Sequence, residues 1–193
     1  RIVREHLQGQ GLLSPDAGRG RVSVIGTGLF APMRLAAFAN GTAIHADNFD
    51  DTSPQARPDR TGGIHASGAV LPAVLAVAEA GGLSGERLLA AYHVGMEVSS
   101  RLNHAMDARH YGDGFHTTGT LNVFGAAAAA GHALGLDETA HVAAVGLAAS
   151  QASGVRRNFG TMAEILHAGH AAECGIAAAD FARLGMTAAD DAL

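Results

Sequence analysis

The stretch TGTLNVFGAAAAAGHAL, residues 118–134, decides the fold class of this chain. Its apolar residues cover nearly every side of a helix, so this helix is expected at the centre of a domain rather than on its surface. Apolar residues recur at helical spacing in five further stretches, residues 35–45, 69–80, 84–105, 138–152 and 168–184. The sequence therefore predicts an all-α fold, a compact bundle of helices rich in Ala and Gly.

The ends of these stretches carry helix start and stop signals. Ser84 and Thr118 are expected to cap helix N-termini, and Gly81 and Gly135 stand where helices should end. The chain is interpreted as a single helical domain, residues 1–193. Its first part, residues 1–30, is expected to be irregular apart from one short strand at 22–25.

Two connections stand out between the predicted helices. Residues 53–63 carry two prolines and a glycine pair, and residues 108–116 carry two glycines and mixed charge. Long connections within a compact domain are often functional, so both are predicted to be active-site loops.

The composition bounds the possible functions. With 48% apolar and 16% charged residues, the 193-residue chain fits one folded domain. A net charge of −5 with scattered Arg residues gives no electrostatic reason to bind nucleic acid. No stretch of about 20 apolar residues could span a membrane and nothing resembles a signal peptide, so a cytoplasmic protein is expected.

The rare residue types narrow the chemistry further. All 13 basic residues are Arg, which excludes a Schiff-base lysine or a lysine general base within this chain. Cys174 is the single cysteine, so neither an internal disulfide nor an iron–sulfur cluster on the chain's own thiolates is possible. Any dehydration would have to proceed by metal-free acid–base chemistry.

His116 and His65 are the strongest candidates for proton transfer. His116 follows a Gly-containing loop and precedes a predicted helix, whose N-terminus would attract a carboxylate. An imidazole has an unperturbed pKa of about 6.5, so it can give or take a proton near neutrality. The structural alternatives are a capping or buried histidine at 116 and an exposed loop histidine at 65.

Acidic and basic side chains supply further candidates. Asp51 and Thr52 belong to an Asp-Asp-Thr cluster, which a helix cap or a surface turn explains equally well. Arg101 could bind a carboxylate through its fork of donors, or pair with Glu97 one helical turn away. The Arg156–Arg157 pair could balance substrate charge, although a solvated loop is the simpler interpretation.

The 11 histidines of the chain offer many potential metal ligands. His167, His170 and Glu173 recur every three residues and so share one helix face. No fourth ligand is evident, and no metal is predicted.

Several stretches together resemble the MmgE/PrpD family of small-acid lyases and isomerases. They are NGTAIHADNFDDT (residues 40–52), HASGAVLPA (65–73), GMEV (95–98) with Arg101 and Leu102, YGDGFHTTGT (111–120), and GTM (160–162) with LHAG (166–169). The resemblance begins near Val24 and covers nearly all of the chain that follows. It implies a helical domain whose active site lies in a cleft beneath a second, α+β lid domain, which this chain lacks.

The resemblance also implies roles for single residues. His116 and His65 match positions at the family's active site and are the predicted acid–base pair. Asp51 and Glu164 complete the catalytic candidates. The predicted substrate-binding residues are Asn48, Thr52, Arg101 and His167. Two positions depart from the pattern: relatives often have Asp where this chain has Asn48, and commonly have Lys where it has Glu164.

The function that the resemblance implies is a cofactor-independent lyase acting on a small di- or tricarboxylic acid such as 2-methylcitrate. It would be a dehydratase or decarboxylase that works through proton abstraction α to a carboxylate. An epimerase of an iminodisuccinate-like acid, sharing the first step, is an alternative. A non-catalytic helical assembly module is another. The resemblance further implies a homodimer.

Overall fold

The computed structural model describes residues 1–18, 20–54 and 63–193. The helices are α1 (Ile2–Gly9), α2 (Met33–Ile44), α3 (Ser67–Gly81), α4 (Gly85–Ala105), α5 (Ala108–Gly112), α6 (Thr117–Thr120), α7 (Asn122–Leu134), α8 (Glu138–Ala149) and α9 (Met162–Arg183), with a 3-10 turn η1 (Arg156–Asn158). The short strands are β1 (Arg21–Val24), β2 (Leu29–Pro32), β3 (Ser53–Pro54) and β4 (Gly63–Ile64). The predicted all-α class is confirmed.

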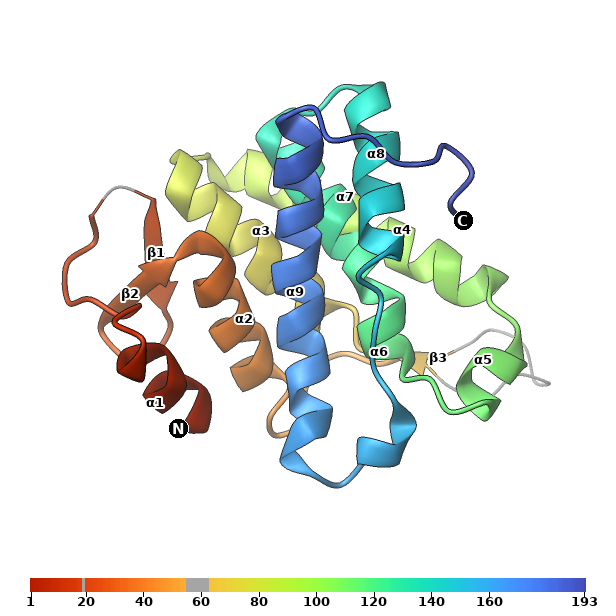
Figure 1. The fold of residues 1–193 in the computed structure, drawn as a ribbon, viewed down its shortest axis with the longest axis horizontal. Helices are drawn as coiled ribbons and strands as arrows, with labels where there is room; N and C mark the ends of the chain where they lie inside the picture. The colour runs from red at the N-terminus through yellow and green to blue at the C-terminus, as the bar shows by residue number, and fades with distance from the viewer. Residues whose placement is uncertain (19, 55–62) are drawn as a thin grey trace.

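Helix α7 forms the centre of the domain, as its sequence predicts. Its alanines and its two glycines are buried, and it packs against α3, α4, α8 and α9. Figure 1 shows α9 running across the face of the bundle, with α2 and α3 to one side and α8 to the other. None of the helices in the described part of the chain combines the length and the apolar character needed to cross a bilayer.

Glycines let the backbones of these helices approach one another closely. A Cβ added at Gly41 in α2 would lie 2.9 Å from the Gly169 Cα in α9. One added at Gly95 in α4 would lie 2.6 Å from the Gly125 carbonyl oxygen in α7. Contacts under 3.0 Å would force the two helices apart, so these crossings depend on the missing side chain.

The prediction of an irregular segment at residues 1–30 is wrong. It contains α1 and the antiparallel β1–β2 hairpin, in which Val22 pairs with Ala31. The predicted strand at 22–25 corresponds to β1, but its partner β2 was not anticipated. Val22 and Val24 are buried while their neighbours face outward, so one face of the hairpin covers the bundle.

Two predicted boundaries also need correction. The single helix expected at 118–134 is divided at Leu121 into α6 and α7. The Thr120 hydroxyl donates back to the His116 carbonyl, a bond that competes with the regular helical pattern and bends helices. The expected cap at Thr118 falls instead at His116, whereas the Ser84 cap is confirmed by its bond from the Arg87 amide.

The structure can be compared with the two predicted loops to different extents. Residues 108–116 are not all loop, because Asp107 accepts the Arg109 amide and starts the short helix α5. Most of the loop predicted at 53–63 lies outside the described residues. Its two described ends pair as β3 and β4, with Ser53 opposite Ile64.

Candidate active site

Four histidines from four parts of the chain gather at one end of the bundle. His45 follows α2, His65 follows β4, His116 precedes α6, and His167 lies in α9. The ring centroids of His45 and His65 are 5.0 Å apart, those of His45 and His116 are 6.0 Å apart, and those of His116 and His167 are 5.1 Å apart. We call these four residues the histidine cluster.

Small residues make this convergence possible. Gly119 lies so close to the Ser153 carbonyl that an added Cβ would sit 2.3 Å from its oxygen, with His167 at 3.2 Å. The Gly41–Gly169 contact draws the α2 end that carries His45 toward the α9 turn that carries His167. A larger side chain at these glycines would separate the rings.

His116 and His167 share one hydrogen bond, with 2.8 Å between their Nδ1 atoms. One ring must therefore donate a proton while the other accepts it. Burial lowers the pKa of His116 to about 3, with His167, the other cluster histidines and Arg156 adding to the effect. Burial also lowers the pKa of His167, although Glu164 opposes this. The pair is neutral at pH 7.

Asp50 binds two members of the histidine cluster from within the domain. Its side chain is 2% exposed, and its Oδ2 atom accepts a 2.9 Å hydrogen bond from His45 Nδ1. Its Oδ1 atom is buried 3.5 Å from His65 Nδ1 and has no hydrogen-bond partner among the described residues. From the sequence Asp50 stands out only as a member of the Asp-Asp-Thr cluster and His45 does not stand out, although both lie in the stretch that carries the family resemblance.

His65 and His167 are the partly exposed members of the cluster, whereas His45 and His116 are buried, and the His65 side chain is 21% exposed. The His65 backbone is fixed on both sides, because its amide donates to the Thr118 hydroxyl and its carbonyl accepts from the Asn122 side chain. Thr52, predicted to bind substrate, places its hydroxyl 3.5 Å from His65 Nδ1. The structure thus brings Thr52 to the cluster.

The other acidic candidates make structural hydrogen bonds. Asp51 accepts the Ser67 amide at 3.0 Å and bonds the Ser67 hydroxyl, which secures the start of α3. Glu164 accepts the Gly160 amide at 2.8 Å in the first turn of α9. Asp51 thus binds the first amide of α3 from a distant segment, since the N-cap residue of this helix is Ala66.

Among the described residues, neither the Asn48 nor the Arg101 side chain is hydrogen-bonded to the histidine cluster, although the Asn48 amide donates to the His45 carbonyl at 3.3 Å. Asn48 is exposed and holds a left-handed conformation, with φ at 57°, which Asn tolerates better than most residues. The Arg101 side chain is 79% exposed and lies 2.7 Å from Glu97, the ion pair weighed as its structural alternative. An exposed pair at this spacing contributes about 0.3–0.5 kcal/mol.

Arg156 brings a positive charge to the cluster. Its guanidinium carbon lies 3.7 Å from the centre of the Tyr111 ring, and Nη1 donates to the Tyr111 carbonyl at 2.5 Å. Its Nε atom is buried and finds no hydrogen-bond partner in the residues that the structure describes. The sequence indicated that the Arg156–Arg157 pair could balance substrate charge. It does not reveal which of the two side chains is directed toward the histidine cluster.

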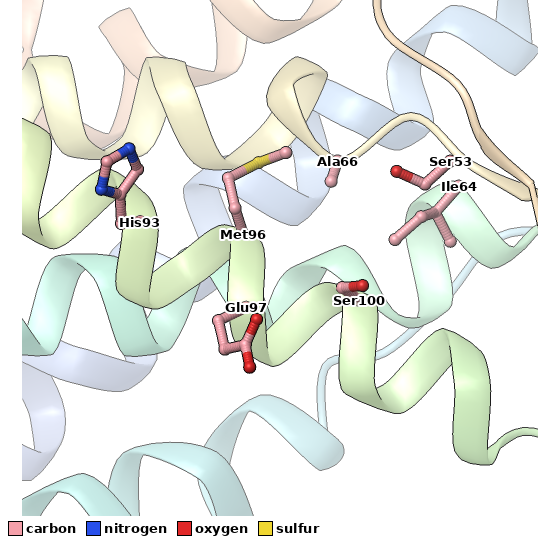
Figure 2. Close-up of a pocket in the computed structure, with 7 residues that line it drawn as sticks. All are labelled: Ser53, Ile64, Ala66, His93, Met96, Glu97 and Ser100. Carbon is pink, nitrogen blue, oxygen red and sulfur yellow. The ribbon is translucent and has the colours of Figure 1, made fainter.

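A cavity of about 370 Å³ lies between α4 and the segment that carries His65, whose neighbours Ile64 and Ala66 line it. Figure 2 shows the residues that line it: His93, Met96, Glu97 and Ser100 come from α4, with Met96 pointing toward Ala66, and Ser53, Ile64 and Ala66 come from the segments beside this helix. A second hollow, of about 770 Å³, lies between the N-terminal residues, α2 and the start of α9. The histidine cluster lines neither of them.

Comparison with known proteins gives consistent results. The family model described as MmgE/PrpD N-terminal domain matches residues 5–193. Cis-aconitate decarboxylase of Homo sapiens is 42% identical over 160 residues, which cover 80% of this chain and 32% of that protein. Cis-aconitate decarboxylase of Mus musculus is 39% identical over 160 residues, covering 80% and 31%. The chain thus spans about a third of the length of these relatives.

Proposed function

Since the chain belongs to the MmgE/PrpD family, we propose that it forms the helical part of a cofactor-independent lyase for a small di- or tricarboxylic acid. The names of the two relatives favour a carboxy-lyase acting on a cis-aconitate-like acid. The observation that carries the proposal is the half-buried histidine cluster, in which Asp50 holds one imidazole and another shares a proton with a neighbour.

His65 is the proposed proton-transfer group. The Asp50 carboxylate beside its Nδ1 favours the tautomer with the proton on that atom, which leaves Nε2 for the substrate. Its partly exposed side chain also has access to a substrate. Thr52 lies against the same Nδ1 atom and helps to hold the ring.

His116 has a different proposed role from the acid–base one expected from sequence. With a pKa of about 3 it is a weak base at neutral pH, and its neutral ring can donate a hydrogen bond. When its Nδ1 accepts from His167, its Nε2 carries the proton. A neutral imidazole of this kind stabilises an enediolate without giving up its proton.

Loss of CO2 from the acid breaks a carbon–carbon bond and leaves the electron pair on a carbanion delocalised into a neighbouring carboxylate. His116 would stabilise that charge. His65, protonated on both ring nitrogens with Asp50 beside Nδ1, would deliver its Nε2 proton to form the new C–H bond and return to the neutral Nδ1–H tautomer. Arg156, with its unpartnered Nε, would bind a carboxylate that is retained in the product.

Proton NMR in D2O tests the proposal. The chain is incubated with cis-aconitate and with citrate-, malate- and aspartate-like acids. We expect CO2 release from cis-aconitate with one deuterium at a product carbon. The variant His65→Gln should be slower by about 10²–10⁴-fold, the usual contribution of a positioned proton donor.

His93→Gln is the matched control, because His93 is exposed and lines the separate 370 Å³ cavity. Exchange of the α-proton without a change in mass would favour the epimerase alternative. A folded chain that releases no CO2 and exchanges no proton with any of these acids would contradict a catalytic role for the chain.

A further inference from the structure

His45, Asp50 and His65 form a group whose ligand atoms all lie within 4.8 Å of one another. Among the residues that the structure describes, this group of three His, Cys, Asp or Glu side chains is close enough to share one ion. The trio weighed from the sequence, His167, His170 and Glu173, is not. Glu173 is instead paired with Arg34 at 3.2 Å.

The spacing of the group suits a small divalent ion. Metal–ligand distances of about 2.0–2.1 Å place two ligands of a tetrahedral zinc ion about 3.3 Å apart. The separations here are 2.9 Å between His45 Nδ1 and Asp50 Oδ2, and 3.5 Å between His65 Nδ1 and Asp50 Oδ1. Two imidazoles and one carboxylate are also a ligand set that zinc prefers, with a fourth position left for water.

The buried carboxylate is the second observation. Asp50 is 2% exposed, and within the described part of the chain its Oδ1 atom has no hydrogen-bond partner, although His65 Nδ1 lies 3.5 Å away. A buried carboxylate oxygen without a partner carries a desolvation penalty that a proton on His45 does not relieve, because that proton lies against Oδ2. An ion between the two rings would interact with both carboxylate oxygens at once.

We propose that His45, Asp50 and His65 bind a divalent transition-metal ion of the zinc class, and that the bound ion inhibits the chain by occupying His65. Both rings would then carry their proton on Nε2 and present the Nδ1 lone pair to the ion. The inhibitory part rests on the proposed function, since it removes the proton-transfer group. The binding part does not.

Calorimetric titration of the EDTA-treated chain with ZnCl2 tests the binding. We expect one ion per chain and, with Co²⁺ as a probe, visible absorption typical of a tetrahedral site. Asp50→Asn and His65→Gln should each weaken binding at least about 10-fold, because even groups behind a metal ligand are worth 10- to 100-fold. His170→Gln should bind as the unmodified chain does.

Several outcomes would overturn the proposal. They are no saturable binding of either metal, binding that survives in both Asp50→Asn and His65→Gln, and binding that His170→Gln abolishes. Far-UV circular dichroism shows whether each variant is folded. His65→Gln changes the more exposed ligand, so it keeps the test valid if Asp50→Asn does not fold.

The two proposals fail separately. Turnover of cis-aconitate by the metal-free chain tests the function, whereas the titration tests the site without any substrate. Where both succeed, one equivalent of Zn²⁺ should abolish turnover and EDTA should restore it. Binding of zinc with unchanged turnover would overturn the inhibitory part.

Discussion

The His116 ring is 4% exposed and has two other imidazoles within 6.0 Å, which makes it a costly place for a positive charge. In the unfolded chain the same ring titrates near its ordinary pKa of 6.5. Between this value and about 3 the unfolded chain therefore binds more protons than the folded one. The contribution of the neutral His116 ring to the free energy of unfolding is therefore fully present above pH 6.5. It is lost progressively as the pH falls toward 3.

We therefore expect the metal-free chain to lose stability below pH 6.5, with His116 contributing at most about 1.4 kcal/mol per pH unit. Urea unfolding between pH 4 and pH 8, with EDTA present, measures this. The curve for His116→Gln should be shallower, and that for His93→Gln should match the unmodified chain. Parallel curves for all three proteins would contradict the assigned pKa shift.

Arg156 is the second residue whose role can be tested alone. If it binds a substrate carboxylate, Arg156→Gln should raise KM about 10- to 100-fold, the equivalent of the roughly 1.5–3 kcal/mol that a charged hydrogen bond contributes. The effect on kcat should be smaller. Arg157→Gln is the matched control, because Arg157 is exposed on the same turn. Equal changes in both variants would argue against a binding role for Arg156.

The Asp50–Asp51 pair shows where prediction from sequence stops. The two residues have the same side chain, so their chemistry does not reveal which one is buried. The backbone direction set after α2, where Asn48 takes a left-handed conformation, turns Asp50 toward His45 and leaves Asp51 to meet Ser67. His65 and His116 could be named because each stands beside a glycine-containing loop and matches an active-site position in the family that the sequence resembles.

At the level of helices, the helix starts and the close crossings determine how well the site is held. Asp51 accepts the amide of the first residue of α3, the helix that follows His65 in the chain. Gly95 lies against the Gly125 carbonyl, Val70 and Ala129, each within 2.8 Å of an added Cβ. The start of α3 therefore depends on the Asp51 side chain, whereas the α4–α7 crossing depends on the absence of a side chain at Gly95.

Replacing Asp51 with Ala should lower the free energy of unfolding by about 1 kcal/mol, as expected for the loss of a side chain that accepts a first-turn helix amide. Asp51→Asn keeps an acceptor oxygen and should retain most of the free energy of unfolding that Asp51→Ala loses. Chemical unfolding together with turnover separates the two roles of Asp51. A variant Asp51→Asn that is stable but inactive would support the catalytic role predicted from sequence.

Gly95→Ala should destabilise the chain by about 1–3 kcal/mol, because the added methyl overpacks the α4–α7 crossing. Gly85→Ala, at the start of the same helix, adds a methyl where nothing lies within 4 Å and should be neutral or slightly stabilising. Urea midpoints compare the two variants. A neutral Gly95→Ala would mean that α4 moves aside without loss.

The helices were predictable because their periodicity is local, and α7 shows this most clearly. Its division from α6 was not predictable. Besides the local bond from the Thr120 hydroxyl to the His116 carbonyl, the two helices are held by bonds from Thr117 to the Gly63 carbonyl and from Asn122 to the His65 carbonyl, across more than 50 residues of sequence. The β1–β2 hairpin was half predicted for a similar reason: β2 has too few residues to show a period, and its pairing is set by contact with β1.

For the whole molecule, the predicted homodimer remains a prediction. Sedimentation equilibrium should give twice the chain mass of 19.5 kDa. A mass that stays at 19.5 kDa over a wide concentration range would contradict it. The experiment is best done with EDTA, so that a metal shared between chains does not contribute.

The stacking of Arg156 on Tyr111 has an optical consequence. The chain has no Trp and two Tyr residues, so its intrinsic ultraviolet fluorescence comes from Tyr92 and Tyr111 alone. Tyr111 lies under the guanidinium group that is proposed to meet the substrate. A carboxylate that draws Arg156 away from this ring would change the emission of about half of the chain's fluorophores. The unlabelled protein thus contains its own reporter of ligand binding.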